Sequence, residues 1–296
     1  MFSHTSTTVD KGGSCADLRA DVYPSTPAIT MSRNVDISTK GSIMTAATSG
    51  YADVNGLHLY YELHGSGRPL VLLHGGMLTI DLSFGDLIPL LVDKHQVIAV
   101  ELQGHGRTAD IDREITPANS ASDVVALLDH LGIDRADVLG HSMGAATAMA
   151  LAVSHPDRVG SIVPVSVTVR PDGMHPDFGD PERMATSTRM PTQQDFEAFT
   201  QAYQRLSPHP EHFDEFLATQ SSSNADLVGW SDAQLAGITT PVLIVLGDHD
   251  FMTVAHGGLM LDLIPNSQLA VLPNTTHMQA THRVDLLVPI LAAFLG

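Results

Sequence analysis

The chain has 296 residues, 43% of them hydrophobic, which suits one large α/β domain or two smaller ones with a core of their own. Its 33 acidic and 15 basic side chains give a net charge of −18, which argues against nucleic acids and anionic membranes as partners. No apolar run reaches the ~18 residues of a membrane span, and the single cysteine, Cys15, excludes an intramolecular disulfide and a multi-cysteine metal cluster.

The first part of the chain, residues 1–49, is rich in serine and threonine and shows no periodicity of helix or strand. We interpret it as a flexible arm ahead of the folded domain. Its first residues carry neither a basic start nor an apolar stretch, so no secretory signal is predicted and the cytoplasm is the expected location.

Ordered structure is predicted from Tyr51 onward, and it begins with a hairpin over 52–62, because Asn55-Gly56 suits a type I′ turn. Apolar runs of strand length then alternate with segments of helical periodicity. The expected strands are 69–73, 96–100, 136–140, 161–167, 241–246 and 268–272. The expected helices are 84–94, 145–154, 254–263, 284–295 and one that Ser120 opens and caps, with Asp123 three residues later. This alternation predicts an α/β fold: a mostly parallel sheet with helices on both faces.

The alternation stops over residues 168–230, a stretch with several prolines and many aromatic side chains. Thr192 is expected to cap a helix there, whose apolar stripe comprises Phe196, Phe199, Tyr203 and Leu206. We therefore expect 168–230 to form a helical cap, or lid, over the strand ends of a core made of 50–167 and 231–296. Its aromatic and methionine side chains belong to the interior of the cap or to pocket walls, and they favour an apolar substrate group.

The clearest chemical motif is Gly140-His141-Ser142-Met143-Gly144, which follows a predicted buried strand and opens a helix. Its two glycines leave room for a strained turn that would raise the Ser142 hydroxyl above the sheet. The helix N-terminus behind the turn offers free N–H groups that favour a developing oxyanion. The motif therefore indicates a nucleophilic serine rather than a packing turn of small residues.

In this context the sequence resembles the α/β-hydrolase family in its capped, cofactor-free form, over nearly all of residues 51–296. The family's catalytic triad runs serine, acid, histidine along the chain, which implies Ser142 as the nucleophile. The family pattern places the acid three residues after a glycine, which favours Asp250 and leaves Asp248 to support the turn. The base is then His277, in the turn after the last predicted strand.

The same resemblance implies an oxyanion hole in the His74-Gly75-Gly76 loop, with the backbone N–H groups of Gly76 and Met143 as donors. His74 is expected to brace this loop. The turn that begins at Glu101 departs from the family pattern, in which aspartate is commoner at that position. Glu101 is an alternative acid because it also ends a strand, but it precedes the serine in the chain.

Metal and cofactor sites are not expected from the sequence motifs. Despite 16 histidines, the chain carries neither an H-x-H-x-D-H nor an H-E-x-x-H array. It also lacks the glycine-rich phosphate loop and the dinucleotide fingerprint. We expect no cofactor and no metal, a small molecule as the partner and no nucleic acid or membrane; a homodimer stays open.

These observations predict a serine hydrolase that cleaves a carboxylic ester or lactone of a mainly apolar small molecule through an acyl-enzyme. The same residues would also serve a carbon–carbon bond hydrolase, an amidase or a perhydrolase. A serine at the turn argues against dehalogenases and epoxide hydrolases of this fold, which use aspartate there. A non-catalytic ligand receptor on the same fold is the alternative of a different class, although such a protein needs no complete triad.

Overall fold

The computed structural model of the protein describes residues 48–223 and 229–296. The predicted arm over 1–49 falls outside this part except for its last two residues, which already belong to a strand. Among the helices of the described residues, none combines the length and the apolar character that crossing a bilayer requires.

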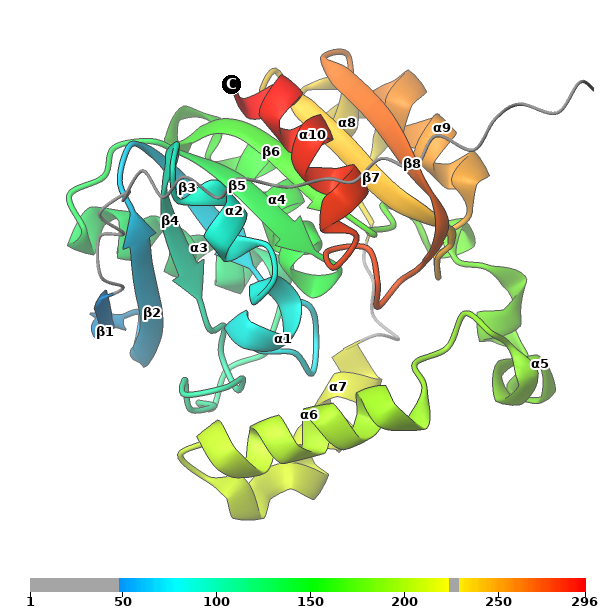
Figure 1. The fold of residues 1–296 in the computed structure, drawn as a ribbon, viewed down its shortest axis with the longest axis horizontal. Coiled ribbons are helices and arrows are strands. Elements are labelled where there is room, and N and C mark those ends of the chain that lie inside the picture. Colours follow the sequence, from blue (N-terminus) through cyan, green and yellow to red (C-terminus); the bar gives the residue numbers. More distant parts are fainter. Residues whose placement is uncertain (1–47, 224–228) are drawn as a thin grey trace, which may run out of the picture. The chain divides into compact units, whose positions relative to one another are not determined.

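An eight-stranded sheet forms the centre of the described chain, in the order β1-β2-β4-β3-β5-β6-β7-β8 (Figure 1). The strands are β1 (Thr48–Val54), β2 (Leu57–Gly65), β3 (Arg68–Leu73), β4 (His95–Val100), β5 (Ala136–His141), β6 (Val159–Val165), β7 (Val242–His249) and β8 (Ser267–Thr276). The pairs β1·β2 and β2·β4 are antiparallel, and the others are parallel. The β1–β2 turn has positive φ at both Asn55 and Gly56, so the predicted type I′ hairpin is confirmed.

Two apolar clusters sandwich the sheet, because neighbouring residues of a strand point to opposite faces. In β3, Val71 and Leu73 belong to one cluster, whereas Leu70 and Leu72 belong to the other. The first cluster is covered by α3 (Pro117–His130), α4 (Met143–Ser154), α8 (Asp232–Ala236) and α9 (Val254–Leu263). The second is covered by α1 (Ile80–Phe84), α2 (Ile88–Leu91) and α10 (Val284–Leu295). The predicted α/β class, with helices on both faces, is thus confirmed.

The prediction of one helix over 84–94 is wrong. Helix α1 ends at Phe84, a turn follows, and α2 begins only at Ile88. Pro89 explains the break, because its nitrogen has no hydrogen to donate to the carbonyl of Gly85 and its ring would clash with that carbonyl.

The predicted start of the next helix at Ser120 is also wrong. Helix α3 begins at Pro117, and the Thr116 hydroxyl accepts a hydrogen bond from the Asn119 N–H at 3.1 Å. Proline suits the first helical position, since the N–H that it lacks would have no partner there. Asp123 does not serve a cap either: its carboxylate pairs with Arg113 at 2.6 Å.

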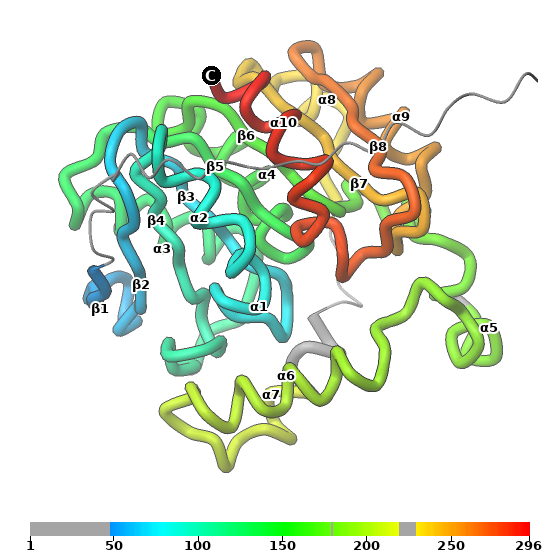
Figure 2. Tube along the Cα trace, viewed as in Figure 1, coloured from blue at the N-terminus to red at the C-terminus, as the bar shows by residue number. Residues whose placement is uncertain are grey.

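The chain leaves the sheet between β6 and β7 and forms a helical segment, which we call the insertion (residues 168–230). It contains α5 (Pro181–Thr186), α6 (Gln193–Leu206), α7 (Phe213–Ser223) and the short 3-10 helices η2 (Pro171–Gly173), η3 (Pro176–Gly179) and η4 (Pro210–His212). Figure 2 follows this excursion from the green to the yellow part of the trace. As expected, Thr192 caps α6, in a reciprocal arrangement with Asp195.

The insertion is tied to loops that follow the carboxyl ends of core strands. The ring of Phe216 in α7 meets the ring of His105, which follows β4, with the two centroids 5.1 Å apart. The guanidinium of Arg189 donates to the backbone oxygen of Asp250, which follows β7, at 2.9 Å. The insertion therefore contacts loops at the carboxyl ends of the strands, the side on which ligands of open α/β sheets bind.

Candidate active site

Ser142 occupies a strained turn between β5 and α4. Its φ of 51° and ψ of −111° lie outside the regions that L-residues prefer, a conformation that costs on the order of 1–3 kcal/mol. The Ser142 N–H donates to the Val165 carbonyl at 2.8 Å, which fixes the turn to the end of the adjacent strand β6.

The two glycines of the motif permit this turn through close backbone contacts. A Cβ on Gly140 would overlap the carbonyl of Gly144, and a Cβ on Gly144 would overlap the carbonyl of Leu73. Any side chain at either position would push α4 away from the strand ends. The local sequence thus sets the position of Ser142 at the N-terminus of α4.

Asp250 and His277 form a buried pair. The His277 Nδ1–H donates to Asp250 Oδ1 at 2.7 Å, and both side chains are almost fully removed from solvent. The Asp250 carboxylate also accepts hydrogen bonds from the Ser166 hydroxyl at 2.5 Å and from the Gly247 N–H at 3.2 Å. Burial by itself would raise the pKa of Asp250, but the His277 charge and these hydrogen bonds outweigh it and lower the pKa to about 2. Asp250 is therefore an anion at neutral pH.

Asp248 has a different environment. Its carboxylate accepts from the Thr275 N–H at 3.0 Å and lies 2.8 Å from the ring of His249, with the side chain 35% exposed. It joins the ends of β7 and β8, as a turn-supporting residue does. Of the two candidate acids, the structure brings Asp250 to His277.

His141 links the serine turn to the loop that carries His277. Its Nε2–H donates to the His277 carbonyl at 3.0 Å, and the two ring centroids are 5.0 Å apart. The His277 ring also stacks on the ring of Phe251, with the two centroids 3.9 Å apart. Burial and the neighbouring His277 charge lower the pKa of His141 to about 3, so this ring is neutral. Because His141 directly precedes Ser142, these contacts place the loop that carries His277 next to the turn that carries Ser142.

The loop after β3 is held to the first turn of α4. The Gly144 N–H donates to the His74 carbonyl at 3.1 Å. The buried His74 ring donates through Nδ1 to the Gly75 carbonyl at 2.8 Å and accepts the Leu102 N–H at 3.0 Å, so it braces the loop. Met143 is the first residue of α4, where backbone N–H groups have no partner within the helix. The two expected oxyanion donors, Gly76 and Met143, thus belong to segments that are hydrogen-bonded together.

Glu101, the alternative acid, is engaged elsewhere. Its buried carboxylate accepts from the Arg107 guanidinium at 2.8 Å and from the Arg107 N–H at 2.6 Å. Burial raises the pKa of Glu101, and the Arg107 contacts oppose that effect. The structure does not bring this side chain to His277, whose Nδ1 pairs with Asp250.

Comparison with known proteins identifies the family. The family model described as "alpha/beta hydrolase fold" matches residues 68–216, about half of the chain. The chain belongs to the α/β-hydrolase fold family.

Several relatives share the name "Putative carbamate hydrolase RutD", among them two that match different shares of this chain. The protein from Caulobacter vibrioides is 36% identical over 123 residues, which cover 40% of this chain and 45% of the relative, so the match spans about half of that protein's length. The protein from Azorhizobium caulinodans is 26% identical over 268 residues, which cover 83% and 98% of the two chains. Among solved structures, one described as "Est816 as an N-Acyl homoserine lactone degrading enzyme" has a TM-score of 0.68 and 26% identity, covering 82% of this chain and 99% of Est816.

The sequence alone did not predict the roles of three residues around this α/β-hydrolase site. They are Ser166, Arg189 and His141, which connects the serine turn to the His277 loop. Ser166 directly follows β6, and its φ of 60° turns the hydroxyl to Asp250. Its position at the carboxyl end of a predicted parallel strand could have identified Ser166, because the carboxyl ends of parallel strands lie on the same side of the sheet. His141 contacts His277, and Arg189 contacts Asp250. Both partners are distant in sequence, so no local pattern predicts these roles.

The buried neutral histidines predict a loss of stability in acid. Burial lowers the pKa of both His74 and His141 to about 3, whereas an unfolded histidine titrates near ~6.5. Below about pH 6.5 the unfolded chain therefore binds protons that the folded chain excludes. We expect the free energy of unfolding to fall by roughly 1.4 kcal/mol per pH unit for each ring, until the pH approaches about 3.

Urea denaturation between pH 8 and pH 4.5 measures this slope. The variant His141→Gln should lose the contribution of one ring. An unchanged slope in His141→Gln would show that His141 takes up its proton while the protein is folded.

Proposed function

We propose that the protein is a serine hydrolase that cleaves a carboxylic ester or a lactone of a mainly apolar small molecule. The observation that carries this proposal is the buried Asp250–His277 pair, 2.7 Å apart, with the loop of His277 hydrogen-bonded to His141, the residue before Ser142. In such a pair the carboxylate orients the imidazole, and the second ring nitrogen can accept a proton from a serine hydroxyl.

In the proposed mechanism, Ser142 Oγ attacks the substrate carbonyl carbon while His277 Nε2 accepts the hydroxyl proton. Asp250 holds the Nδ1–H and stabilises the imidazolium. The N–H groups of Gly76 and Met143 donate to the oxyanion of the tetrahedral intermediate. The intermediate collapses to an acyl-enzyme when the imidazolium returns its proton to the leaving alcohol, and a water molecule activated by the same base then releases the acid.

The insertion is proposed to act as the lid of this site. Phe216 rests against His105, and Arg189 binds the backbone of Asp250, so the segment contacts two loops next to the proposed triad. Its aromatic residues favour an apolar acyl or alcohol group. A lactone suits the same chemistry, since it is an ester whose leaving oxygen stays attached to the acyl group. Similarity to Est816 over most of the chain supports including lactones.

Cleavage of a carbon–nitrogen bond is the second candidate, and similarity to the two RutD proteins favours it. It uses the same nucleophile and base but requires His277 to protonate a leaving nitrogen. The two candidates therefore differ in the leaving group and share the proposed triad.

A substrate panel with mass detection of products tests the proposal. The panel contains p-nitrophenyl esters, N-acyl lactones, amides, carbamates and vinylogous diketones. We expect hydrolysis of esters or lactones, together with an acyl adduct on the peptide that contains Ser142. Cleavage confined to amides, carbamates or diketones would reassign the reaction, and ligand binding without turnover of any compound would indicate a receptor.

A further inference from the structure

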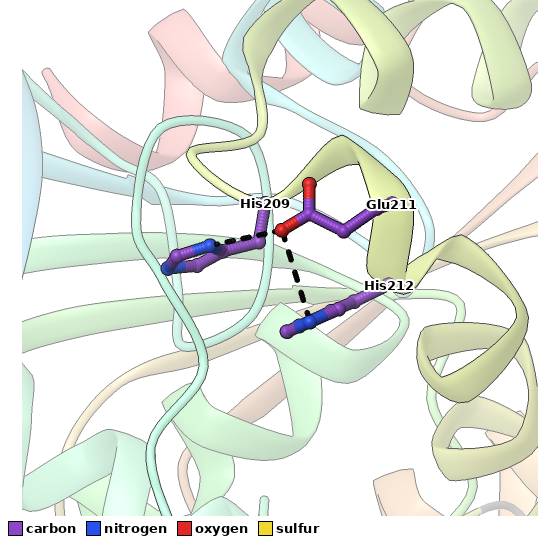
Figure 3. Close-up of side chains that lie close together, drawn as sticks. All are labelled: His209, Glu211 and His212. Carbon is purple, nitrogen blue, oxygen red and sulfur yellow. Dashed lines mark ion pairs between the residues drawn. The ribbon is translucent and has the colours of Figure 1, made fainter.

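A cluster of potential metal ligands lies on the insertion, in the turn between α6 and α7. It consists of His209, Glu211 and His212, all exposed, in and next to η4 (Figure 3). Glu211 Oε1 lies 3.4 Å from His209 Nδ1 and 3.8 Å from His212 Nε2. One ligand atom from each residue lies within 4.8 Å of the others.

The distances between these nitrogen and oxygen atoms are close to the distances between ligand atoms around a bound transition-metal ion. Tetrahedral zinc, with bonds of about 2.0–2.1 Å, holds neighbouring ligand atoms about 3.4 Å apart. The His209–Glu211 separation already has this value, and the Glu211–His212 separation exceeds it only slightly. The two imidazoles are near-parallel, with their centroids 5.3 Å apart, so the rings have to rotate before a nitrogen of each can bind the same ion.

The backbone of this turn is fixed by hydrogen bonds from α6. The Tyr203 hydroxyl donates to the His209 carbonyl at 3.3 Å, and the Gln204 amide donates to the Pro210 carbonyl at 3.1 Å. Within the turn, the His212 N–H donates to the His209 carbonyl at 3.1 Å. Binding therefore has to order three side chains but not the backbone, which reduces the entropy lost.

The surroundings favour a cation. After Arg205, the sequence contains no lysine or arginine as far as Trp230, and Asp214 and Glu215 follow His212 by two and three residues. Glu215 Oε2 also lies 4.0 Å from His212 Nδ1, the ring nitrogen away from Glu211. A carboxylate in that place is the usual outer partner of a metal-bound histidine, because it orients the ring and increases its basicity.

We propose that His209, Glu211 and His212 bind one divalent transition-metal ion of the zinc type, with Glu215 orienting His212. Two imidazoles and a carboxylate favour such an ion over magnesium or calcium, which prefer oxygen ligands. The His-Pro-Glu-His spacing matches neither of the two metal-binding arrays that the sequence analysis considered. The ion would join the end of α6 to the start of α7 and so stiffen the helix pair that contacts the core through Phe216.

Calorimetric titration of the full chain, purified without a histidine tag, with Zn²⁺ alone tests this site. We expect the parent protein to bind one equivalent that is lost in both His209→Ala and His212→Ala. Glu211→Gln keeps the shape of the side chain and should also weaken binding strongly. Glu215→Gln should weaken binding roughly 10–100-fold, as loss of an outer carboxylate does.

A matched control is His58→Ala, because His58 is also exposed but faces a single carboxylate, Asp53, at 2.7 Å. It should keep the zinc equivalent, and so should Ser142→Ala, which separates this site from the proposed reaction. Zinc should raise the melting temperature of the parent and of both controls, but not that of His209→Ala. Absence of zinc binding in the parent, or binding that persists in His209→Ala and Glu211→Gln, would overturn the proposal.

Discussion

Replacing Ser142 with alanine is expected to lower kcat for ester hydrolysis by roughly 10⁶-fold, the loss seen when a catalytic serine is removed. Without the hydroxyl no acyl-enzyme forms, and the remaining groups can only polarise the carbonyl for attack by water. KM should change little, because a hydroxyl contributes little to ground-state binding. Initial rates with a p-nitrophenyl ester measure the loss, and circular dichroism shows whether the fold is retained.

Two further serine variants make this result interpretable. Ser122→Ala removes an exposed hydroxyl that only bonds a carbonyl within α3, and it should keep the parent kcat. Ser142→Gly should be as inactive as the alanine variant but more resistant to urea, because glycine adopts the φ of 51° without strain. Parent-like turnover by Ser142→Ala would exclude this residue as the nucleophile.

Local patterns were sufficient for most of the fold. Helices 254–263 and 284–295 are predicted with the bounds that α9 and α10 have. The two errors concern proline. Pro89 interrupts an apolar run that otherwise resembles one helix, and Thr116-Pro117 starts α3 one turn before its apolar stripe begins. Both prolines are local signals, but the prediction followed the spacing of the apolar residues instead.

The candidate site required more than local pattern. Ser142 could be identified from its motif, and His277 from its place after the last strand, because strand ends in a parallel sheet converge. The family spacing favours Asp250 over Asp248, but it does not predict the irregularity in the β7·β8 pairing between Gly247 and His249, just before Asp250. A register shift of this kind arises from contacts between two strands, and the sequence of either strand alone does not specify it.

The Asp250→Asn substitution is expected to lower kcat by roughly 10⁴-fold while Asp248→Asn leaves it near the parent value. An asparagine at 250 can offer its NH₂ group to His277 Nδ1 and so stabilise the tautomer whose Nε2 carries the proton and cannot act as a base. It also removes the charge that stabilises the imidazolium. Asp248→Asn keeps an oxygen that can accept the Thr275 N–H, so the turn should persist.

The stability of Asp250→Asn provides a second test, because Asp250 is buried and has a pKa lowered to about 2. The pKa of Asp248 is also lowered to about 2, but that carboxylate is partly exposed, so its effect on stability is screened by solvent. A buried carboxylate with such a pKa stabilises the fold above its unfolded pKa of ~3.9, and the contribution is lost as the pH falls towards 2. Asp250→Asn should therefore unfold more easily at neutral pH, with a smaller further loss between pH 4 and pH 2. A large fall in kcat for Asp248→Asn, with parent-like kcat for Asp250→Asn, would instead assign the catalytic acid to Asp248 and require the β7–β8 turn to rearrange when substrate binds.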